Sequence, residues 1–282
     1  NSALLIGDVM LSDSPEHMTL VQVTDTHLTG DSDGTLLGMN TERSARQVID
    51  AALASQQPDC VLVTGDIAAD GQAAAYEQLN GFFNHRVPTL WLPGNHDDVR
   101  AQKGAYRDHL KRRIVGRHWD VLMLETQVAG KVGGYFSSAE LDALQRAVAD
   151  AAAGDKSLLI ATHHPLRALQ STWLDEQAVS NASAALTIMQ ALSDRVVVVS
   201  GHVHQESDAV VQGVRMLTTP STCIEFAPQS HDFALDDKQP GYRPAQNHGT
   251  EAQIRYTWKG FSAFAHPGPP RHSLDARNHH RP

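Results

Sequence analysis

Five short polar clusters, each directly after an apolar run, constrain this chain more than any other feature. The apolar runs are Leu20–Val23, Val61–Val63, Val87–Leu92, Leu158–Ile160 and Val196–Val199. Runs of this kind are typical of strands buried on both faces of a sheet. Since α/β proteins build sites at the carboxyl ends of strands, one site assembled from several strand ends is expected. The clusters are Asp25-Thr-His27, Gly65-Asp66, Gly94-Asn95-His96-Asp97, His163-His164-Pro165 and Gly201-His202-Val203-His204.

Each cluster has an ordinary explanation when it is taken alone. A Gly-Asp pair after a strand is usually a turn, and the sequence around Asn95 is compatible with an Asx turn. The pair His202 and His204 is more informative, because two histidines straddling a strand end can turn toward one ion. All five clusters in this order indicate oxygen and nitrogen ligands for two metal ions, as in a dinuclear metallohydrolase.

The segments between the clusters predict alternating strands and helices. Thr41 is a plausible N-cap for a helix over residues 42–55, and a second helix is expected over residues 73–83. This β-α-β-α-β order favours parallel pairing. A charged helical stretch is expected at Arg100–Arg113, most simply as a solvated face, and Ser138 is expected to cap a later helix. Further strands are predicted at Asp120–Thr126, Leu158–Thr162, Val196–Ser200 and Val214–Thr218.

The domain organisation predicted from composition is a single α/β domain over residues 18–265. Residues 1–17 form an N-terminal extension, and residues 266–282 are rich in Pro, His and Arg and are expected to be disordered. From about residue 220 the chain is expected to form a C-terminal cap of loops and antiparallel strands. The segments assigned to this cap are Ser221–Pro228, Pro240–Arg243 and Glu251–Trp258.

Net charge and cysteine content limit the binding partners and the cellular location that are expected for the chain. The net charge of −9 argues against nucleic acid and membrane surfaces as partners, although bound metal ions would still allow a small anionic substrate. Cys60 and Cys223 make no disulfide framework. The chain has no apolar stretch of transmembrane length, and its opening residues lack the basic region of a signal peptide. A cytoplasmic location is therefore expected.

The cluster residues divide into two ligand groups around a shared carboxylate. Asp66 is the natural bridging residue, because it lies between the two groups in sequence order. Asp25, His27 and one histidine of the pair His202 and His204 would complete the first ion. Asn95, His163 and the other histidine of that pair would complete the second. Carboxylate, amide and imidazole ligands suit iron, manganese or zinc, and a hydroxide between two such ions could attack phosphorus.

Three further residues in the clusters have expected roles. His96 follows Asn95 directly and is the best candidate for a catalytic histidine that is not a ligand. Asp97 could fix the tautomer of His96 or cap a helix. Since adjacent strand residues point in opposite directions, we expect His163 to be the ligand and His164 to pack beside it.

The motif set resembles that of the calcineurin-like metallophosphoesterases, with every ligand position occupied between about residues 20 and 205. Finer features are similar to the class III cyclic nucleotide phosphodiesterases, especially the bacterial 3′,5′-cyclic AMP phosphodiesterases. One departure is Leu166, where related enzymes often carry a second proline after His-His-Pro. The finer features are Asp25-Thr-His27-Leu28, Asn95-His96-Asp97, His163-His164-Pro165, Thr219-Pro-Ser-Thr222 and Pro240-Gly-Tyr-Arg243.

The resemblance implies a four-layer αββα sandwich and the hydrolysis of 3′,5′-cyclic AMP to AMP. It implies two metal ions, iron and/or manganese with zinc as an alternative, and a small cyclic nucleotide as the partner. The residues expected to contact the substrate are His27, Asn95, His96 and His204. Arg243 would either reach the substrate or brace the cap, with the second role favoured.

Other functions share much of this pattern. The same metal chemistry would serve a broader phosphodiesterase acting on glycerophosphodiesters or 2′,3′-cyclic nucleotides. A scaffold that has lost catalysis would have no chemical need for the intact ligand set and His96. A DNA nuclease is disfavoured by the acidic balance of the chain. The pattern leaves the oligomeric state open.

Overall fold

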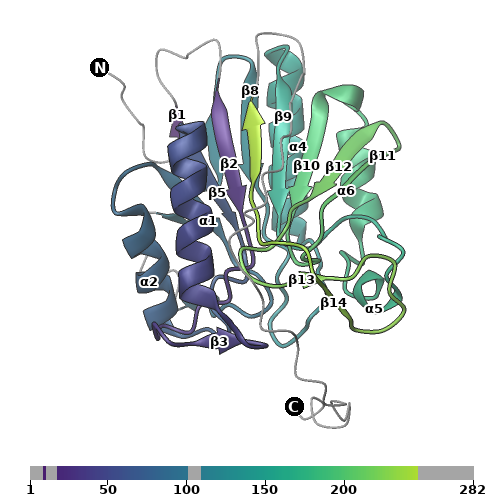
Figure 1. The fold of residues 1–282 in the computed structure, drawn as a ribbon. Helices are drawn as coiled ribbons and strands as arrows, with labels where there is room; N and C mark the ends of the chain where they lie inside the picture. The colour runs from purple at the N-terminus through teal and green to yellow at the C-terminus, as the bar shows by residue number, and fades with distance from the viewer. Residues whose placement is uncertain (1–8, 11–17, 101–108, 247–282) are drawn as a thin grey trace.

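Two β-sheets form the centre of the molecule in the computed structural model, which describes residues 9–10, 18–100 and 109–246 (Figure 1). The first sheet has the order β15-β2-β5-β6, and the second has the order β1-β7-β8-β9-β10-β12-β11. The strands of the first sheet are β2 (Thr19–Val23), β5 (Cys60–Thr64), β6 (Thr89–Leu92) and β15 (Arg243–Gln246). Those of the second are β1 (Val9–Met10), β7 (Arg113–Val115), β8 (Trp119–Met123), β9 (Ser157–Thr162), β10 (Val196–Ser200), β11 (Ser207–Val211) and β12 (Val214–Thr218).

Helices cover the outer face of each sheet. On the first sheet, α1 (Thr41–Gln56) and α2 (Ala73–Phe83) pack over Val21 and Val63. On the second, α4 (Ser138–Ala153) and α6 (Ala182–Met189) pack over Ile160 and Val198. The inner faces of both sheets meet in a third apolar cluster that includes Leu62. The expected four-layer αββα sandwich is confirmed.

Strand pairing brings the carboxyl ends of the central strands to one edge of the molecule. In the first sheet, β2, β5 and β6 are parallel, with Val21 opposite Val61 and Val61 opposite Thr89. In the second sheet, β8, β9, β10 and β12 are parallel. The antiparallel pairs lie toward the sheet margins, at β15–β2, β7–β8 and β11–β12. All five polar clusters therefore leave their strands in the same direction, as the sequence predicts.

Several element boundaries differ from those expected. The N-cap of α1 is Asn40, one residue before Thr41, because the Asn40 side chain accepts the Arg43 N–H at 2.7 Å. The N-cap of α4 is likewise Ser137, one residue before Ser138, and its side chain accepts the Glu140 N–H. The expected strand from Asp120 to Thr126 is β8, which ends at Met123.

The charged helix expected over Arg100–Arg113 does not reach its predicted end. Residues 101–108 lie outside the described residues, and Arg113 begins β7. The reason is packing, since Ile114 is completely buried and pairs with Val121 of β8.

Several elements have no counterpart among the expectations, and β1, β11 and α6 are examples. In β1, Val9 and Met10 pair with β7, so this part of the predicted N-terminal extension joins a sheet. Most of that extension, the segment 251–258 and the predicted tail 266–282 lie outside the described residues. Within the described part of the chain, no helix has both the length and the apolar character needed to span a bilayer.

Candidate metal centre

Five residues of the polar clusters have left-handed backbone conformations at the strand ends. Their φ angles are 55° for Asp25, 44° for His27, 48° for Asp66, 68° for His202 and 45° for His204. Such conformations are uncommon outside glycine and concentrate at functional sites. Two hydrogen bonds hold the first turn against the second, from Asp25 N–H to the Gly65 carbonyl and from His27 N–H to the Asp66 carbonyl.

Close packing explains why glycines accompany the ligand-type residues. A Cβ atom at Gly201 would lie 2.6 Å from Asp25 Oδ2. At Gly65, where φ is 98°, a Cβ atom would lie 2.5 Å from His163 Nδ1. Neither position can carry a larger side chain without moving a candidate ligand, so these glycines allow the polar side chains to converge.

The first group of candidate ligands consists of Asp25, His27 and His204. His204 Nδ1 donates to the Ile224 carbonyl at 2.7 Å, which turns the Nε2 atom toward the other two residues. This Nε2 atom is 3.2 Å from His27 Nε2 and 3.3 Å from Asp25 Oδ1. Asp25 Oδ1 is buried and has no hydrogen-bond partner among the described residues. A metal ion among these three atoms would satisfy it.

The second group consists of Asn95, His163 and His202. His163 Nδ1 lies 2.8 Å from the Thr64 carbonyl, so Nε2 faces the site, 3.2 Å from Asn95 Oδ1. His202 is oriented the other way round, with Nε2 at 2.9 Å from Gln177 Oε1. Its buried Nδ1 lacks a hydrogen-bond partner within the described part of the chain. The sequence leaves the assignment of His202 and His204 open, whereas the structure places His202 beside His163.

Asp66 lies between the two groups. Its Oδ2 atom is 3.3 Å from His163 Nε2 and 3.8 Å from His27 Nε2. Its Oδ1 atom accepts the backbone N–H of His96 at 2.9 Å. One carboxylate oxygen is therefore anchored while the other faces both groups, which is the arrangement that a bridging ligand needs.

Burial and neighbouring charges set the protonation states of the candidate ligands. Burial lowers the pKa of His27 to about 3 and that of His202 well below its usual value. Burial opposes the ionisation of Asp25, but His204 and His163 together lower its pKa to about 2. For His163, burial favours the neutral ring, yet the Asp66 carboxylate raises its pKa to about 9. His163 Nε2, which faces Asp66, is therefore an atom for which a proton and a metal ion would compete.

The donor set fits two metal ions. A buried carboxylate oxygen on Asp25 and a buried ring nitrogen on His202 are costly to leave without partners, and both belong to the groups described above. Imidazole, carboxylate and amide donors suit first-row transition metals. Cys60 and Cys223 are buried, and burial raises the pKa of each thiol to about 12, so neither supplies a thiolate.

His96 and His164 differ in whether a ring nitrogen is free to contact a substrate or a metal ion. The His96 side chain is exposed, its Nδ1 lies 3.0 Å from the Ala69 carbonyl, and its ring meets that of His27 edge-on at 5.1 Å. His164 uses both ring nitrogens, with Nδ1 at 2.8 Å from Thr126 Oγ1 and Nε2 at 2.8 Å from the Val132 carbonyl. His164 thus packs beside the candidate ligands without a free ring nitrogen.

Both roles expected for Asp97 are wrong. The His96 ring is oriented by the Ala69 carbonyl and not by Asp97. Asp97 instead accepts the backbone N–H groups of Gly94, Ile67 and Ala68 together with the Tyr76 hydroxyl. Its carboxylate therefore ties the loop after β6 to the loop after β5.

Arg243 makes the contacts expected of a residue that braces the cap. Its side chain is buried and donates to the Thr218 carbonyl at 2.7 Å and to Thr219 Oγ1 at 3.2 Å. The neighbouring Tyr242 hydroxyl lies 2.8 Å from Ser55 Oγ of α1. These contacts brace the C-terminal cap against both the second sheet and the first helix layer.

Several side chains that contact the candidate ligands are not among the residues predicted from the sequence. Thr24 donates to Asp25 Oδ2 at 2.6 Å, and its position directly before Asp25 could have indicated this. Gln177 orients His202, yet it follows the short helix α5 (Thr172–Asp175) without any recognisable motif. Phe226 stacks on the His204 ring at 4.2 Å, a contact between distant segments that only the fold creates.

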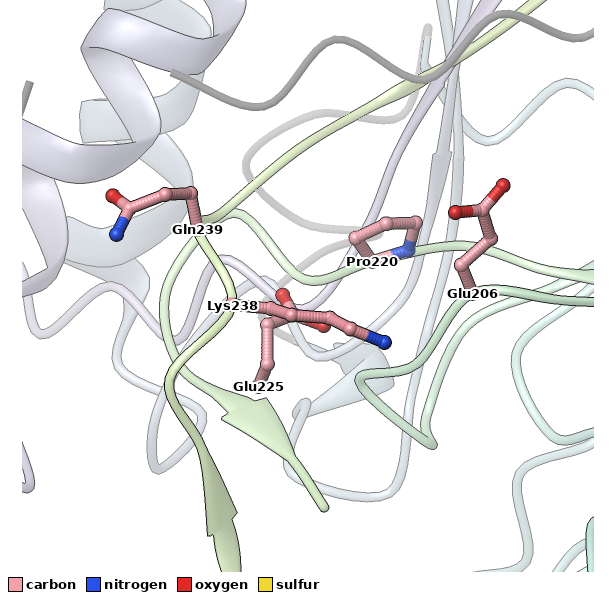
Figure 2. Close-up of a pocket in the computed structure, with 5 residues that line it drawn as sticks. All are labelled: Glu206, Pro220, Glu225, Lys238 and Gln239. Atoms are coloured by element: carbon pink, nitrogen blue, oxygen red, sulfur yellow. The ribbon is translucent and has the colours of Figure 1, made fainter. Parts of the chain in front are cut away.

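A small cavity of about 110 Å³ lies in the cap, next to the two-stranded sheet of β13 (Glu225–Phe226) and β14 (Leu235–Asp236) (Figure 2). Glu225 is buried there, and burial raises the pKa of its carboxyl well above the usual value. None of the lining residues is a candidate metal ligand, so the cavity is separate from the metal centre. The lining residues are Glu206, Pro220, Glu225, Lys238 and Gln239.

Comparisons with known proteins show to which family the chain is similar. A 3′,5′-cyclic adenosine monophosphate phosphodiesterase CpdA of Escherichia coli strain K12 is 38% identical over 235 residues, which cover 81% of this chain and 85% of that protein. A CpdA of Pseudomonas aeruginosa is 36% identical, over 79% of this chain and 83% of that protein. A dimetal phosphatase from Danio rerio shares the fold with a TM-score of 0.61 at 16% identity, over 81% of this chain and 95% of the other. The calcineurin-like phosphoesterase family matches residues 18–206. The chain therefore belongs to the calcineurin-like phosphoesterase family.

Proposed function

We propose that this protein is a dinuclear metal-dependent phosphodiesterase that hydrolyses 3′,5′-cyclic AMP to AMP. The observation that carries the proposal is the 38% identity to a cyclic AMP phosphodiesterase over most of both chains. The convergence of two ligand groups on Asp66 supports it, because a two-metal clamp suits the displacement of an oxygen at phosphorus.

In this proposal each ion has its own ligand group, with Asp66 shared between them. Asp25, His27 and His204 would hold one ion, and Asn95, His163 and His202 would hold the other. Iron and/or manganese fit the nitrogen and oxygen donors. When bound, the ions supply a hydroxide nucleophile at neutral pH and neutralise charge on the phosphate oxygens.

The protein's own groups position the substrate and move the proton. His96 is the proposed proton donor for the leaving ribose oxygen, because its ring is exposed and one ring nitrogen lies within 4.8 Å of ligand atoms of His27 and Asp66. The Ala69 carbonyl fixes the orientation of the His96 ring. His27, Asn95 and His204 flank the same space and are proposed to contact the phosphate together with His96.

The experiment that tests this function is hydrolysis by the manganese- or iron-reconstituted protein. Cyclic AMP, 2′,3′-cyclic AMP, glycerophosphocholine and bis(p-nitrophenyl) phosphate are compared as substrates, and AMP is identified by chromatography. We expect the highest kcat/KM for 3′,5′-cyclic AMP, with the Asp66→Ala protein as the control for contaminating enzymes. If glycerophosphocholine or the 2′,3′-cyclic nucleotide has the higher kcat/KM, the protein is a broader phosphodiesterase and not a cyclic AMP phosphodiesterase.

A further inference from the structure

Three aromatic side chains of different segments lie beside the metal centre. Trp173 of α5, Phe226 of β13 and Phe233, just before β14, form what we term the aromatic triad. Their ring centroids are 5.1, 5.4 and 5.5 Å apart, and every pair meets edge to face. Phe226 also stacks on the candidate ligand His204 at 4.2 Å with an interplanar angle of 13°. The triad therefore continues the wall of the metal centre into the cap.

The outer member of the triad is open to solvent. Phe233 is 53% exposed, and Leu235, two residues later in the sequence, is 45% exposed. The inner member is fixed, since the Phe226 N–H donates to the His204 carbonyl at 3.1 Å. A rigid inner ring and an exposed outer ring form an aromatic surface that begins at a candidate metal ligand.

We propose that the aromatic triad is the base-binding subsite, in which the purine ring of the nucleotide stacks on Phe233 while its phosphate lies at the metal centre. This inference rests on the proposed function, which places a nucleotide at these metals. Stacking on an aromatic side chain uses the π-face that every base has, and it therefore tolerates different bases. The triad selects nucleotides over aliphatic phosphodiesters and does not by itself separate adenine from guanine.

The cap cavity is not part of this subsite. Glu225 precedes Phe226 on β13, and successive side chains of a strand point to opposite faces. Glu225 accordingly lines the cavity shown in Figure 2, whereas Phe226 contacts His204 on the other side. The base is thus held by rings alone, without a hydrogen bond to the buried Glu225 carboxyl.

The test compares two probes that differ only in the base. Calorimetry gives the Kd of AMP and of ribose 5-phosphate for the manganese-loaded wild-type, Phe233→Ala, Phe233→Leu and Phe233→Trp proteins. We expect AMP to bind about tenfold more weakly to the Ala and Leu proteins, and to recover with Trp. The ratio of the two Kd values should change by the same factor. Phe233→Leu keeps an apolar side chain and so separates stacking from simple hydrophobic contact, and Val210→Ala, at a site 68% exposed on β11, is the surface control.

Each other outcome overturns the subsite. If the substitutions weaken the binding of AMP and of ribose 5-phosphate by the same factor, the base does not stack on Phe233. The same conclusion follows if AMP binds all four proteins with the same Kd. If sedimentation shows that Phe233→Ala dissociates a dimer while AMP affinity is unchanged, the triad is an interface between copies of this chain. Turnover by the wild-type protein separates the two proposals. If the wild-type protein releases AMP from cyclic AMP while the Phe233 variants bind AMP as tightly as the wild type, only the proposed subsite is disproved. If the wild-type protein releases no AMP, both the proposed function and the subsite are disproved.

Discussion

At the metal centre the side chains of Asp25, His163 and His204 are almost completely buried, whereas in the cap Phe233 and Leu235 are about half exposed. The buried ligands are also oriented by fixed backbone carbonyls, such as that of Thr64 for His163. In the cap, Leu235 lies on a two-stranded sheet and Phe233 lies in the loop that joins its strands.

This difference in burial corresponds to two functions within one site, namely metal binding and substrate selection. Metal chemistry requires donor atoms held within narrow limits, and the ends of buried parallel strands provide that precision. Substrate choice depends on surfaces that can vary without disturbing the ligands, and exposed loops provide those. Changes at the centre are therefore expected to abolish function, while changes in the cap are expected to redirect or weaken it.

The largest effect is expected from Asp66→Ala at the centre. Loss of the shared carboxylate should remove at least one metal ion and lower kcat about 10³-fold or more, because metal ions supply several kcal/mol of transition-state stabilisation. Metal analysis together with kcat measures both effects. Asp70→Ala, which removes an exposed carboxylate on the same loop, is the control. Full retention of two metals by Asp66→Ala would disprove the bridging role.

A smaller loss is expected from His96→Ala, with the metals retained. Removing a general acid typically costs about 10²- to 10⁴-fold in turnover. The metals should stay because Asp66 is held by the backbone N–H of His96, which the substitution keeps. His85→Asn is the matched control, since His85 is exposed and asparagine tolerates its φ of 59°. Unchanged turnover would exclude His96 from the mechanism.

The pH dependence of metal binding tests the protonation state of the candidate ligands. The pKa of His163 is raised to about 9 in the metal-free protein, so below that pH the ring holds a proton that a metal must displace. His27, with a pKa of about 3, is already neutral in this range. Manganese affinity should therefore rise by about tenfold for each pH unit between 6.5 and 8.5. Anaerobic competition with a chromophoric chelator measures it, and a constant affinity would contradict the protonation of His163.

The smallest effect on turnover is expected where the cap is attached to the sheets. Arg243→Ala removes hydrogen bonds from a buried guanidinium to Thr218 and Thr219, which should lower the free energy of unfolding by about 1.5–3 kcal/mol. Urea denaturation of the metal-loaded protein measures this loss. Arg215→Ala removes an exposed pair with Asp208 and should cost less. If kcat falls while stability is unchanged, Arg243 acts on the substrate and not on the cap.

The sequence predicts the central strands and the convergence of the clusters because both follow from local patterns. The apolar runs before Asp25, Asp66 and His163 are long enough to mark buried strands, and the order of elements implies parallel pairing. The structure confirms this frame. The helix caps differ from the predicted ones by one residue because Asn40 and Thr41, like Ser137 and Ser138, are adjacent residues that can both cap a helix.

The remaining features depend on contacts between distant segments. The Ile224 carbonyl orients His204, and a backbone carbonyl leaves no signal in a sequence. Gln177 reaches His202 because Leu174 of α5 packs in one apolar cluster with Val203, which follows β10. The bonds of Asp97 to two separate loops likewise could not follow from its position beside His96.

The left-handed turns at Asp25, His27, Asp66, His202 and His204 have a consequence for how metals enter this protein. A backbone in such a conformation costs about 1–3 kcal/mol per residue, and the hydrogen bonds between the turns help the fold to offset that cost. An incoming ion consequently meets donors that are already ordered and loses little affinity to chain entropy. The same bent turns should therefore accept iron, manganese or zinc in exchange for one another while the rest of the fold remains intact.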